Sequence, residues 1–376
     1  FLFTKCREPR NDMSRRTLAV KALRIAAAAP PKSPLAALRS FWDSGRSIPS
    51  KVRREARELV FAVLRNEPVL RYNGAATWEE CVDAWEAGGL EVPEGPAERL
   101  GVPEWVAEDL VGQLGLEGVR ALATVVESGS PQVAIRCNTA LTTVSELQER
   151  LEKQGVSTQQ STNVPTALLL SDRHAEVTHT QAFKAGHCEI QGLASQALVG
   201  RLLEVHPRAR SSIDFCAGSG GKALALAAAG VAVECWDPRP GPLRELRKRA
   251  VRARVHNLLE VCPPDQMRPT SGFVVADAPC SNLGLLWRNP TVRWSLPATV
   301  DGLAVVAKQK EVLEAASAFV KPGGILAYAT CSVLSAENRT VEPAGTGWED
   351  VEARTLWPHE DACDGFFWRI WRRLGS

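Results

Sequence analysis

The 376-residue sequence has no apolar run that approaches the roughly 18 residues of a membrane-spanning helix. Its longest candidate, 223–233, suits a short helix followed by a strand, so we expect no membrane association. The ten cysteines include no Cys-x-x-Cys pair and no Cys/His cluster with metal-ligand spacing, which argues against a metal site. Because disulfide frameworks are typical of short secreted chains, we expect reduced thiols and an intracellular location.

Two common phosphate-binding patterns are also missing, the Walker loop and the dinucleotide pattern G-x-G-x-x-G. The sequence begins at Phe1 and not at Met, so we expect a fragment or a processed product and draw nothing from the lack of a targeting signal. The sequence does not distinguish cytoplasm, nucleolus and organelle. For the oligomeric state we expect a monomer.

The net charge of +2 conceals an uneven distribution of charge. Residues 1–76 carry 16 Lys/Arg against 6 Asp/Glu, whereas residues 77–118 carry 11 Asp/Glu and one Arg. The basic part is typical of a surface that faces a polyanion such as RNA. The alternative is a solvated helical face preceded by a basic tail.

Hydrophobic periodicity divides the chain into four parts. We expect a basic, largely disordered or helical tail at 1–34, an all-helical domain at 35–128, a small α+β unit at 129–190 and an α/β domain at 191–376. In the last part strands and helices alternate, which predicts a doubly wound, Rossmann-like, largely parallel sheet. The expected strands are 213–215, 231–236, 258–262, 273–276 and 324–329, with a helix at 300–320 and an antiparallel edge strand at 365–371.

A glycine-rich turn follows the first of these strands and precedes a helix. It comprises Cys216, Ala217, Gly218, Ser219, Gly220, Gly221 and Lys222. Glycines let a ligand approach the backbone closely, and the helix start offers free amides. Asp237 ends the next strand, where an acidic side chain can accept both ribose hydroxyls. A site for a ribose that lacks a phosphate-binding pattern suggests S-adenosylmethionine. The alternative is a turn with a purely structural role.

Two further strand ends carry thiols. The run 273–276 leads into Asp277 and Cys280, and the run 324–329 leads into Cys331. Carbon 5 of a pyrimidine becomes a nucleophile once a thiolate has added to carbon 6. An acid must then stabilise charge at ring nitrogen 3, and a further group must remove the carbon-5 proton. The three side chains can supply these roles, although the residues alone do not decide which thiol attacks.

Several motifs resemble those of the NOL/NOP/Sun-type RNA cytosine-5 methyltransferases. They are DFCAGSGGK (214–222), DAPCSNLG (277–284), RNPTVRW (288–294), GGILAYATCS (323–332) and EN (337–338), together with QGLASQ (191–196) and DGFFWR (364–369). RRTLAVKAL (15–23) and VRREARELVFAVLR (52–65) more weakly resemble the helical RNA-binding domain of the ribosomal RNA branch. The resemblance therefore implies a ribosomal RNA methyltransferase with an N-terminal RNA-binding domain.

The resemblance also implies residue roles. Cys216–Lys222 would hold the methionine part of the cofactor, Asp237 the ribose, Asp265 the adenine amino group, and Asp277 would lie between cofactor and base. Cys331 would be the nucleophile and Cys280 would serve product release. Separately from the resemblance, Arg288 and Arg293 follow the Cys280 motif, and we expect them to contact RNA.

Some positions depart from the family pattern. Ser219 stands where Pro is usual, Gly192 where Asp is usual, Asn282-Leu283 where Gly-Thr is usual, and Trp287 where Arg is frequent. The alternatives to the predicted function are the same chemistry on transfer RNA, a DNA cytosine methyltransferase that attacks with its Pro-Cys thiol, and a non-catalytic ribosome-assembly factor.

Overall fold

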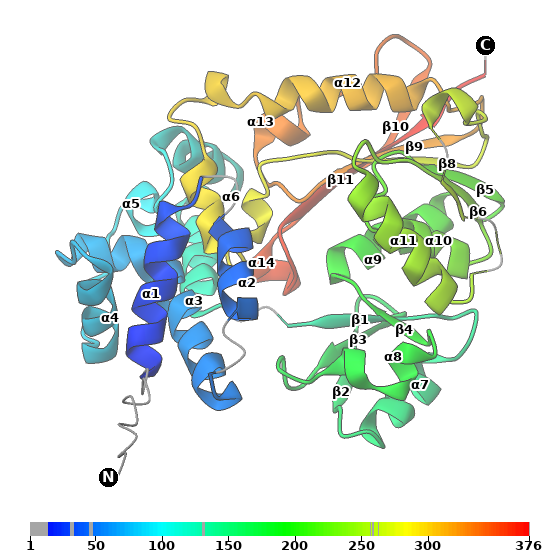
Figure 1. Cartoon of the computed structure of the whole chain (residues 1–376). Helices are drawn as coiled ribbons and strands as arrows, with labels where there is room; N and C mark the ends of the chain where they lie inside the picture. Colours follow the sequence, from blue (N-terminus) through cyan, green and yellow to red (C-terminus); the bar gives the residue numbers. More distant parts are fainter. Residues whose placement is uncertain are drawn as a thin grey trace, which may run out of the picture. The chain divides into compact units, whose positions relative to one another are not determined.

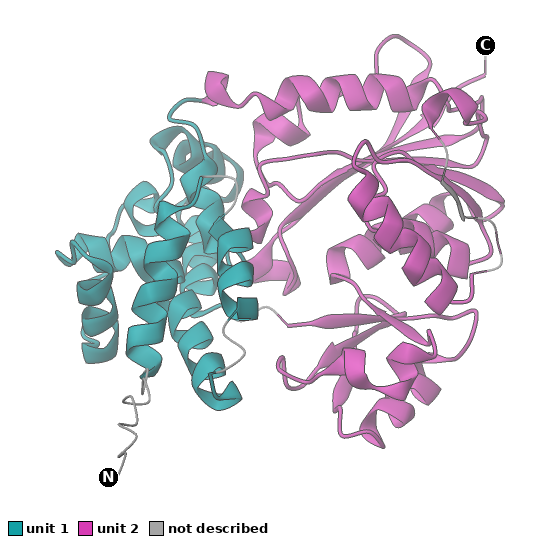
Figure 2. Cartoon of the chain, viewed as in Figure 1, with its two compact units in different colours: residues 1–129, 286–299 teal, residues 130–285, 300–376 magenta. Residues whose placement is uncertain are grey.

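The computed structural model describes residues 14–30, 34–44, 48–129, 132–255, 257, 259–261 and 263–375. The chain divides into two compact units (Figure 2). Unit 1 is formed by residues 1–129 and 286–299, and unit 2 by residues 130–285 and 300–376. Within the described ranges, no helix combines the length and apolar content that a bilayer crossing requires.

Unit 1 is all helical. It contains α1 (Arg15–Ala28), α2 (Pro34–Ser44), α3 (Ser50–Tyr72), α4 (Trp78–Ala87), α5 (Pro96–Leu100) and α6 (Glu104–Ser128) (Figure 1). The apolar face of α3 is buried, with Val60 and Val63 inaccessible to solvent. A capping box starts α4, because Thr77 accepts from the Glu80 amide and the Glu80 side chain accepts from the Thr77 amide.

The structure differs from the predicted boundary at residue 34. Helix α1 buries Leu18, Ala22 and Leu23 in the same core as α2, α3 and α4. Its N-cap is Ser14, whose side chain accepts a hydrogen bond from the Thr17 amide. The second half of the predicted tail is thus a core helix, and residues 1–13 and 31–33 lie outside the described residues.

A segment from the middle of the predicted α/β domain also belongs to unit 1. It spans 286–299 and contains a 3-10 helix, η4 (Pro290–Ser295). The Trp294 indole donates to Glu67, and the Trp105 indole donates to the carbonyl of Pro297. Trp294 also packs against the ring of Trp78. These contacts join residues about 190 to 230 positions apart, a pairing that local periodicity cannot reveal.

Unit 2 begins with a four-stranded antiparallel sheet in the order β2-β3-β1-β4. Its elements are β1 (Ala134–Cys137), α7 (Val144–Glu152), β2 (Thr158–Gln160), β3 (Ala167–Leu170), η1 (Val177–His179), α8 (Gln181–Lys184) and β4 (Cys188–Ile190). Leu147 and Leu151 of α7 pack with Ile135 and Leu168 of the sheet.

A seven-stranded sheet follows, in the order β10-β11-β9-β8-β5-β6-β7. Its strands are β5 (Ser211–Asp214), β6 (Ala232–Cys235), β7 (Leu259–Val261), β8 (Phe273–Asp277), β9 (Ile325–Thr330), β10 (Trp348–Leu356) and β11 (Phe366–Arg373). The five strands from β7 to β9 pair in parallel, and β11 and β10 are antiparallel. The predicted Rossmann-like fold class is confirmed.

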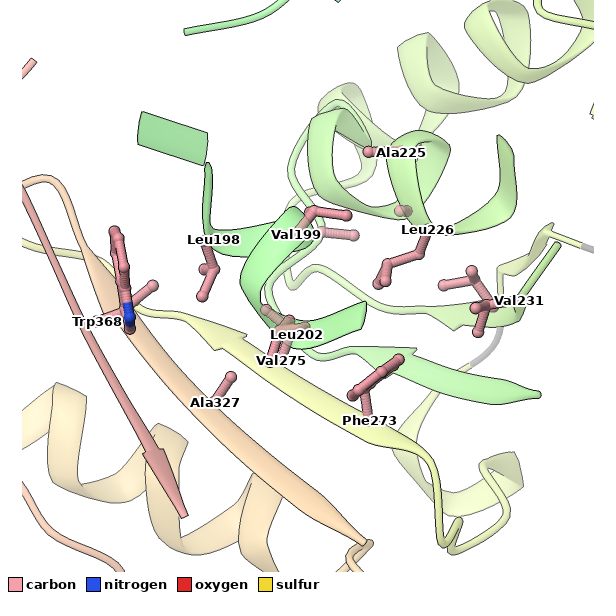
Figure 3. Packing of buried hydrophobic residues seen from close by; sticks show 14 of the residues in the cluster. Leu198, Val199, Leu202, Ala225, Leu226, Val231, Phe273, Val275, Ala327 and Trp368 are labelled. Carbon is pink, nitrogen blue, oxygen red and sulfur yellow. The ribbon is translucent and has the colours of Figure 1, made fainter. Parts of the chain in front are cut away.

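Helices cover both faces of this sheet (Figure 1). On one face, α9 (Leu193–Val205), α10 (Gly221–Ala228) and α11 (Pro240–Arg252) pack on side chains such as Phe273 and Val275 (Figure 3). On the other face, α12 (Val305–Ser317) packs on Val274 and Leu326. Neighbouring residues of β8 thus point to opposite cores, which explains its unbroken apolar run.

Two element predictions need correction. The strand 365–371 was predicted at the sheet edge, but β11 lies between β9 and β10, and β10 forms the edge. The long strand β10 was not predicted, because its outward-facing acidic residues leave little apolar alternation in its sequence. The helix predicted at 300–320 is shorter in the structure, because a 3-10 turn, η5 (Val300–Gly302), precedes α12. Unit 2 also contains two short helices, α13 (Ser335–Asn338) and α14 (Pro358–Asp361).

Candidate functional site

The carboxyl ends of the parallel strands gather the predicted residues at one edge of the seven-stranded sheet. β5 ends at Asp214, β8 at Asp277 and β9 at Thr330, next to Cys331. Asp277 pairs in register with Ala329 of β9, so the two thiol-bearing loops start at the same level of adjacent strands. This is the edge at which open α/β sheets bind ligands.

A cavity of about 460 Å³ lies at this edge. From the predicted cofactor set, its wall contains Ala217, Gly218, Ser219, Gly221, Lys222 and Asp277. Five residues that the sequence did not single out for ligand contact also line it: Gln191, Ser195, Asp214, Arg239 and Pro242. The glycine-rich turn and the acid of the Pro-Cys loop thus share one cavity.

Lys222 is the centre of charge in this cavity. Its ammonium lies 2.5 Å from the Asp277 carboxylate and 5.4 Å from the centre of the Phe366 ring. Burial lowers the pKa of Lys222, but Asp277 and Asp214 outweigh it and the net change is upward. Burial, opposed by Lys222, raises the pKa of Asp214 to about 7. Lys222 therefore remains a cation between two acidic groups.

Asp237 is buried at the end of β6, where it fixes the glycine-rich turn. Its carboxylate accepts hydrogen bonds from the Gly218 amide at 2.9 Å and from the amide and guanidinium of Arg239. Burial raises its pKa, but the hydrogen bonds from Arg239 and Gly218 make the net shift downward. A ribose that reached Asp237 would compete with Arg239 for the carboxylate.

Three other predicted cofactor residues do not line the cavity. Gly220 has φ +85° and packs so closely on Leu246 that a β-carbon would lie 2.6 Å from that side chain. It is therefore required for the turn. Cys216 packs among apolar residues that include Phe319, and burial raises the pKa of its thiol to about 12. Asp265 is exposed on the 3-10 turn η2 (Pro264–Gln266) after β7.

The cavity has the donors and acceptors that S-adenosylmethionine requires. The first turn of α10 directs backbone amides towards it, and the buried Asp214 Oδ1 and Gln191 Nε2 have no hydrogen-bond partner in the described part of the chain. Buried polar groups are normally hydrogen-bonded, so two unpaired polar atoms on one cavity wall are consistent with a polar ligand. Its carboxylate, amino and ribose groups match this mixture of donors and acids.

The two predicted thiols meet at the neighbouring strand ends. The sulfurs of Cys280 and Cys331 lie 3.0 Å apart, and both residues are half-buried. Asn282 Oδ1 lies 2.9 Å from the Cys331 sulfur and 3.8 Å from that of Cys280. The Asn282 backbone has φ 64°, a left-handed conformation that glycine adopts most easily.

A buried carboxylate that the sequence left without a role holds the two thiol loops together. Glu337 accepts from the amide and hydroxyl of Ser281, from the hydroxyl of Ser332 and from the amide of Gln309. Gln309 also donates to the carbonyl of Pro279. Each serine directly follows one of the two cysteines. The motif EN (337–338) marked the position, but its function depends on contacts across 28 to 56 residues.

The two thiols do not have equivalent environments. The hydrogen bond to Cys331, followed by burial and the charge of Glu337, raises the pKa of the Cys280 thiol. The raised pKa keeps the Cys280 thiol protonated. This asymmetry bears on the choice of nucleophile, which the sequence left open.

The two arginines predicted to contact RNA lie in the 286–299 segment of unit 1. Arg288 is half-buried. Arg293 is 6% exposed, donates to the carbonyl of Arg65, and has its pKa lowered to about 10 by burial. Arg293 is therefore a core residue of the helical unit and does not present its guanidinium to a phosphate.

The basic helix α11 is partly tied to the rest of unit 2. Glu189 is buried at the end of β4 and pairs with Arg249 and Arg252. Arg249 also donates to the carbonyl and the hydroxyl of Ser219. The serine that replaces the usual proline in the glycine-rich turn thus provides an additional link to α11. Among the described residues, no group of three or more His, Cys, Asp or Glu could hold a metal ion.

Two family models match the chain. The model described as 16S rRNA methyltransferase RsmB/F matches residues 201–344, and the ferredoxin-like domain of RsmF/B-like methyltransferases matches residues 102–177. The chain is 30% identical over 298 residues to ribosomal RNA small subunit methyltransferase B of Vibrio cholerae and of Xylella fastidiosa. These alignments cover 73% and 71% of this chain and 66% and 67% of the two relatives, so the chain spans about two thirds of their length.

Solved structures share the fold. The crystal structure of PH0851 has a TM-score of 0.75 at 19% identity and covers 98% of this chain and 100% of its own. A methyltransferase homolog from Pyrococcus horikoshii has a TM-score of 0.61 at 24% sequence identity. The match covers 74% of this chain and 98% of that homolog. NSun6 from Pyrococcus horikoshii, solved with SFG, has a TM-score of 0.60 at 18% sequence identity. The match covers 73% of this chain and 99% of NSun6.

Proposed function

Because the chain belongs to the RsmB/F family of 16S rRNA methyltransferases, we propose that it methylates carbon 5 of a cytosine in ribosomal RNA with S-adenosylmethionine as the donor. The observation that carries the proposal is the pair of thiols 3.0 Å apart at the same sheet edge as a cavity lined by Asp277, which ends the strand before Cys280. The methyl donor supplies an electrophilic methyl group when bound.

The attacking group is Cys331. Its sulfur lies 3.0 Å from that of Cys280, and the raised pKa of Cys280 keeps a proton on that neighbouring thiol. The Cys331 thiolate forms a bond to carbon 6 of cytosine, and the electron pair of the 5,6 double bond becomes available at carbon 5. To assist at ring nitrogen 3, where negative charge builds, Asp277 would pass on a proton from the Lys222 ammonium, which lies 2.5 Å away.

Release is assigned to Cys280. Once the Cys331 sulfur is bonded to carbon, its hydrogen bond with Cys280 is lost, so the main cause of that raised pKa disappears. Cys280 can then lose its proton to solvent and take the proton from carbon 5. The carbon–sulfur bond breaks, the 5,6 double bond re-forms, and Cys331 leaves as a thiolate. No oxidant or reductant is needed.

The cofactor assignment rests on the cavity wall. Ala217, Gly218, Ser219, Gly221 and Lys222 would hold the methionine part, and Asp237 would accept the ribose hydroxyls. Asp277 lines this cavity and lies three residues before Cys280 in the chain, so it would lie between cofactor and base. Arg239 would have to leave Asp237 as the ribose enters.

Ribosomal RNA is proposed as the substrate because the relatives from Vibrio cholerae and Xylella fastidiosa carry that substrate in their names. Transfer RNA remains the second candidate. A base in a duplex must leave its stack to reach the thiols, at a cost of a few kcal/mol, so the target is expected in a loop or single strand. We retain Arg288 as a proposed RNA contact and withdraw Arg293, whose guanidinium is buried.

The test compares Cys280→Ala and Cys331→Ala after incubation with S-adenosylmethionine and either 16S ribosomal RNA or transfer RNA. On a denaturing gel, Cys280→Ala is expected to retain a covalent RNA adduct, and Cys331→Ala none. Cys363→Ala removes a buried thiol elsewhere in unit 2 and serves as the control. Normal methylation by both site variants would reject the thiol mechanism and favour an assembly factor. An adduct with transfer RNA alone would reject the ribosomal substrate.

A further inference from the structure

Gln191 lies where the small antiparallel sheet meets the cofactor cavity. It directly follows β4, is 7% exposed, and lines the cavity together with Gly218, Ser219 and Gly221. A β-carbon on Gly221 would lie 3.5 Å from Gln191 Nε2. The side-chain amide therefore faces the turn at which α10 begins.

The orientation of this amide is determined by its neighbour Arg136 of β1. Arg136 Nε donates to Gln191 Oε1 at 2.7 Å, and both side chains are buried. A guanidinium has donors only, so the amide oxygen must face Arg136 and the amide nitrogen must face away from it. Although burial lowers the pKa of Arg136 to about 10, the group keeps its charge at neutral pH.

The nitrogen of Gln191 is left without a partner. Nε2 is buried, and no acceptor for it exists in the described part of the chain. An unmet buried donor is destabilising, so such groups normally find a partner in water or a ligand. The same wall contains the first turn of α10, whose backbone amides and helix dipole also favour a negative group.

We propose that Gln191 Nε2 binds the carboxylate of the methionine part of the cofactor, and that Arg136 acts as the positioning residue that holds the amide in the donating orientation. The inference rests on the proposed cofactor. It makes the small α+β sheet part of the cofactor site, although that sheet contains neither thiol nor glycine turn. Gln191 belongs to the QGLASQ segment, to which the predicted mechanism gave no role.

The direct test measures ligand binding by calorimetry with the full chain. The probes are S-adenosylhomocysteine and its decarboxylated amine analogue, which differ only in the carboxylate. Gln191→Glu keeps an acceptor for Arg136 but replaces the donor by a negative charge. It is expected to weaken S-adenosylhomocysteine binding about 10- to 100-fold, the effect of losing a hydrogen bond to a charged group, and to leave the amine analogue equal or tighter.

The positioning role has its own variants. Arg136→Met frees the amide to turn and is expected to reduce the preference for the carboxylate-bearing ligand about 3- to 10-fold, whereas Arg136→Lys restores most of it. Gln159→Glu makes the same change at an exposed position of β2 in the same sheet and is the matched control. Thermal unfolding of each variant verifies folding.

The outcomes separate this inference from the proposed function. If Gln191→Glu binds both ligands with the wild-type ratio, Gln191 does not contact the carboxylate, its nitrogen is satisfied by water, and the inference is overturned while the cofactor assignment stands. If the wild-type protein binds neither ligand, the proposed function itself fails. A loss of carboxylate preference confined to the Gln191 and Arg136→Met variants supports the inference.

Discussion

The carboxyl edge of the parallel strands has two parts, the charged half around the glycine-rich turn and the half formed by the two thiol loops. Different kinds of interaction stabilise them. Around the glycine-rich turn, charged groups face one another, with Lys222 between Asp214 and Asp277, and Arg239 on Asp237. Around the thiols, one carboxylate, Glu337, accepts hydrogen bonds from neutral donors on both loops. The first half contains orphan polar atoms on a cavity wall, and the second fixes two sulfurs at contact distance.

This difference fits the tasks of the two halves. A charged site with unmet partners can exchange an internal contact for a ligand contact at little cost, as Arg239 would on Asp237. A pair of reacting thiols instead needs a fixed separation, and a carboxylate with both oxygens engaged provides it. The comparison predicts that substitutions in the first half change charge and binding, whereas those in the second change geometry.

The largest effect is expected from Lys222→Met. It leaves Asp277 and the buried Asp214 without their cation, and breaking a buried pair by removing one partner costs about 3–5 kcal/mol. Because the Asp277 side chain is 35% exposed, we expect the lower end, about 3 kcal/mol of unfolding free energy, in urea denaturation. Lys248→Met on exposed α11 is the control. An unchanged midpoint would mean that Lys222 does not organise the charged half.

The next effect is expected from Glu337→Gln. The new amide group turns a donor towards the serine hydroxyls. The clamp, meaning the hydrogen bonds of Glu337 to Ser281, Ser332 and Gln309, then loses about 2 kcal/mol of stabilisation, and the thiol loops separate. Phenylarsine oxide, which binds two neighbouring thiols at once, should bind at least about tenfold more weakly than to the wild-type protein. Glu360→Gln, at an exposed position, should leave binding unchanged. Wild-type affinity in Glu337→Gln would show that the loops hold the sulfurs without the clamp.

A third effect concerns pH. The pKa of Asp214 rises from its ordinary 3.8 to about 7 in the folded protein, so the folded state binds more protons than the unfolded one between these values. Its contribution to stability is therefore lost as pH rises from 4 to 7, by up to about 1.4 kcal/mol per pH unit. Asp214→Asn should flatten the curve of unfolding free energy against pH in this window. Parallel curves for variant and wild type would contradict the raised pKa.

The smallest effect is expected from Asn282→Gly. Glycine accepts the left-handed backbone at φ 64° without strain, so stability should change by less than about 0.5 kcal/mol. The variant loses the oxygen that accepts from the Cys331 thiol, and iodoacetamide should label Cys331 a few-fold faster, as shown by mass spectrometry of the labelled peptide. Ala362→Gly relieves a similar backbone at φ 50° away from the thiols and should not change labelling.

Much of the site was predictable from the sequence because its residues occupy fixed positions relative to strand ends. The glycine-rich turn, Asp237, Asp277, Cys280 and Cys331 all lie at the carboxyl edge of the parallel sheet. Side chains after neighbouring parallel strands must meet at that edge, whatever the loops do. Alternation of apolar runs with helical periods was sufficient for this part of the fold.

Other features depended on contacts that no local pattern encodes. Glu337 is a buried acid on a four-residue helix, and only its partners Ser281, Ser332 and Gln309 reveal the clamp. Arg293 lies in a motif typical of RNA contact, yet its segment folds into the helical unit. The acidic strand β10 takes the edge position expected of β11, because pairing partners are chosen across the whole sheet.

The sequence by itself determined the fold class, the order of the strands that carry chemistry, and the identity of two thiols and an acid at one edge, because hydrophobic period and strand-end position are local properties. The tertiary structure alone decided which groups are paired and which are left open. It placed Gln191 Nε2 and Asp214 Oδ1 without partners on the cavity wall and both oxygens of Glu337 in hydrogen bonds. Burial and pairing depend on residues far apart in the chain, so they follow only from the folded arrangement.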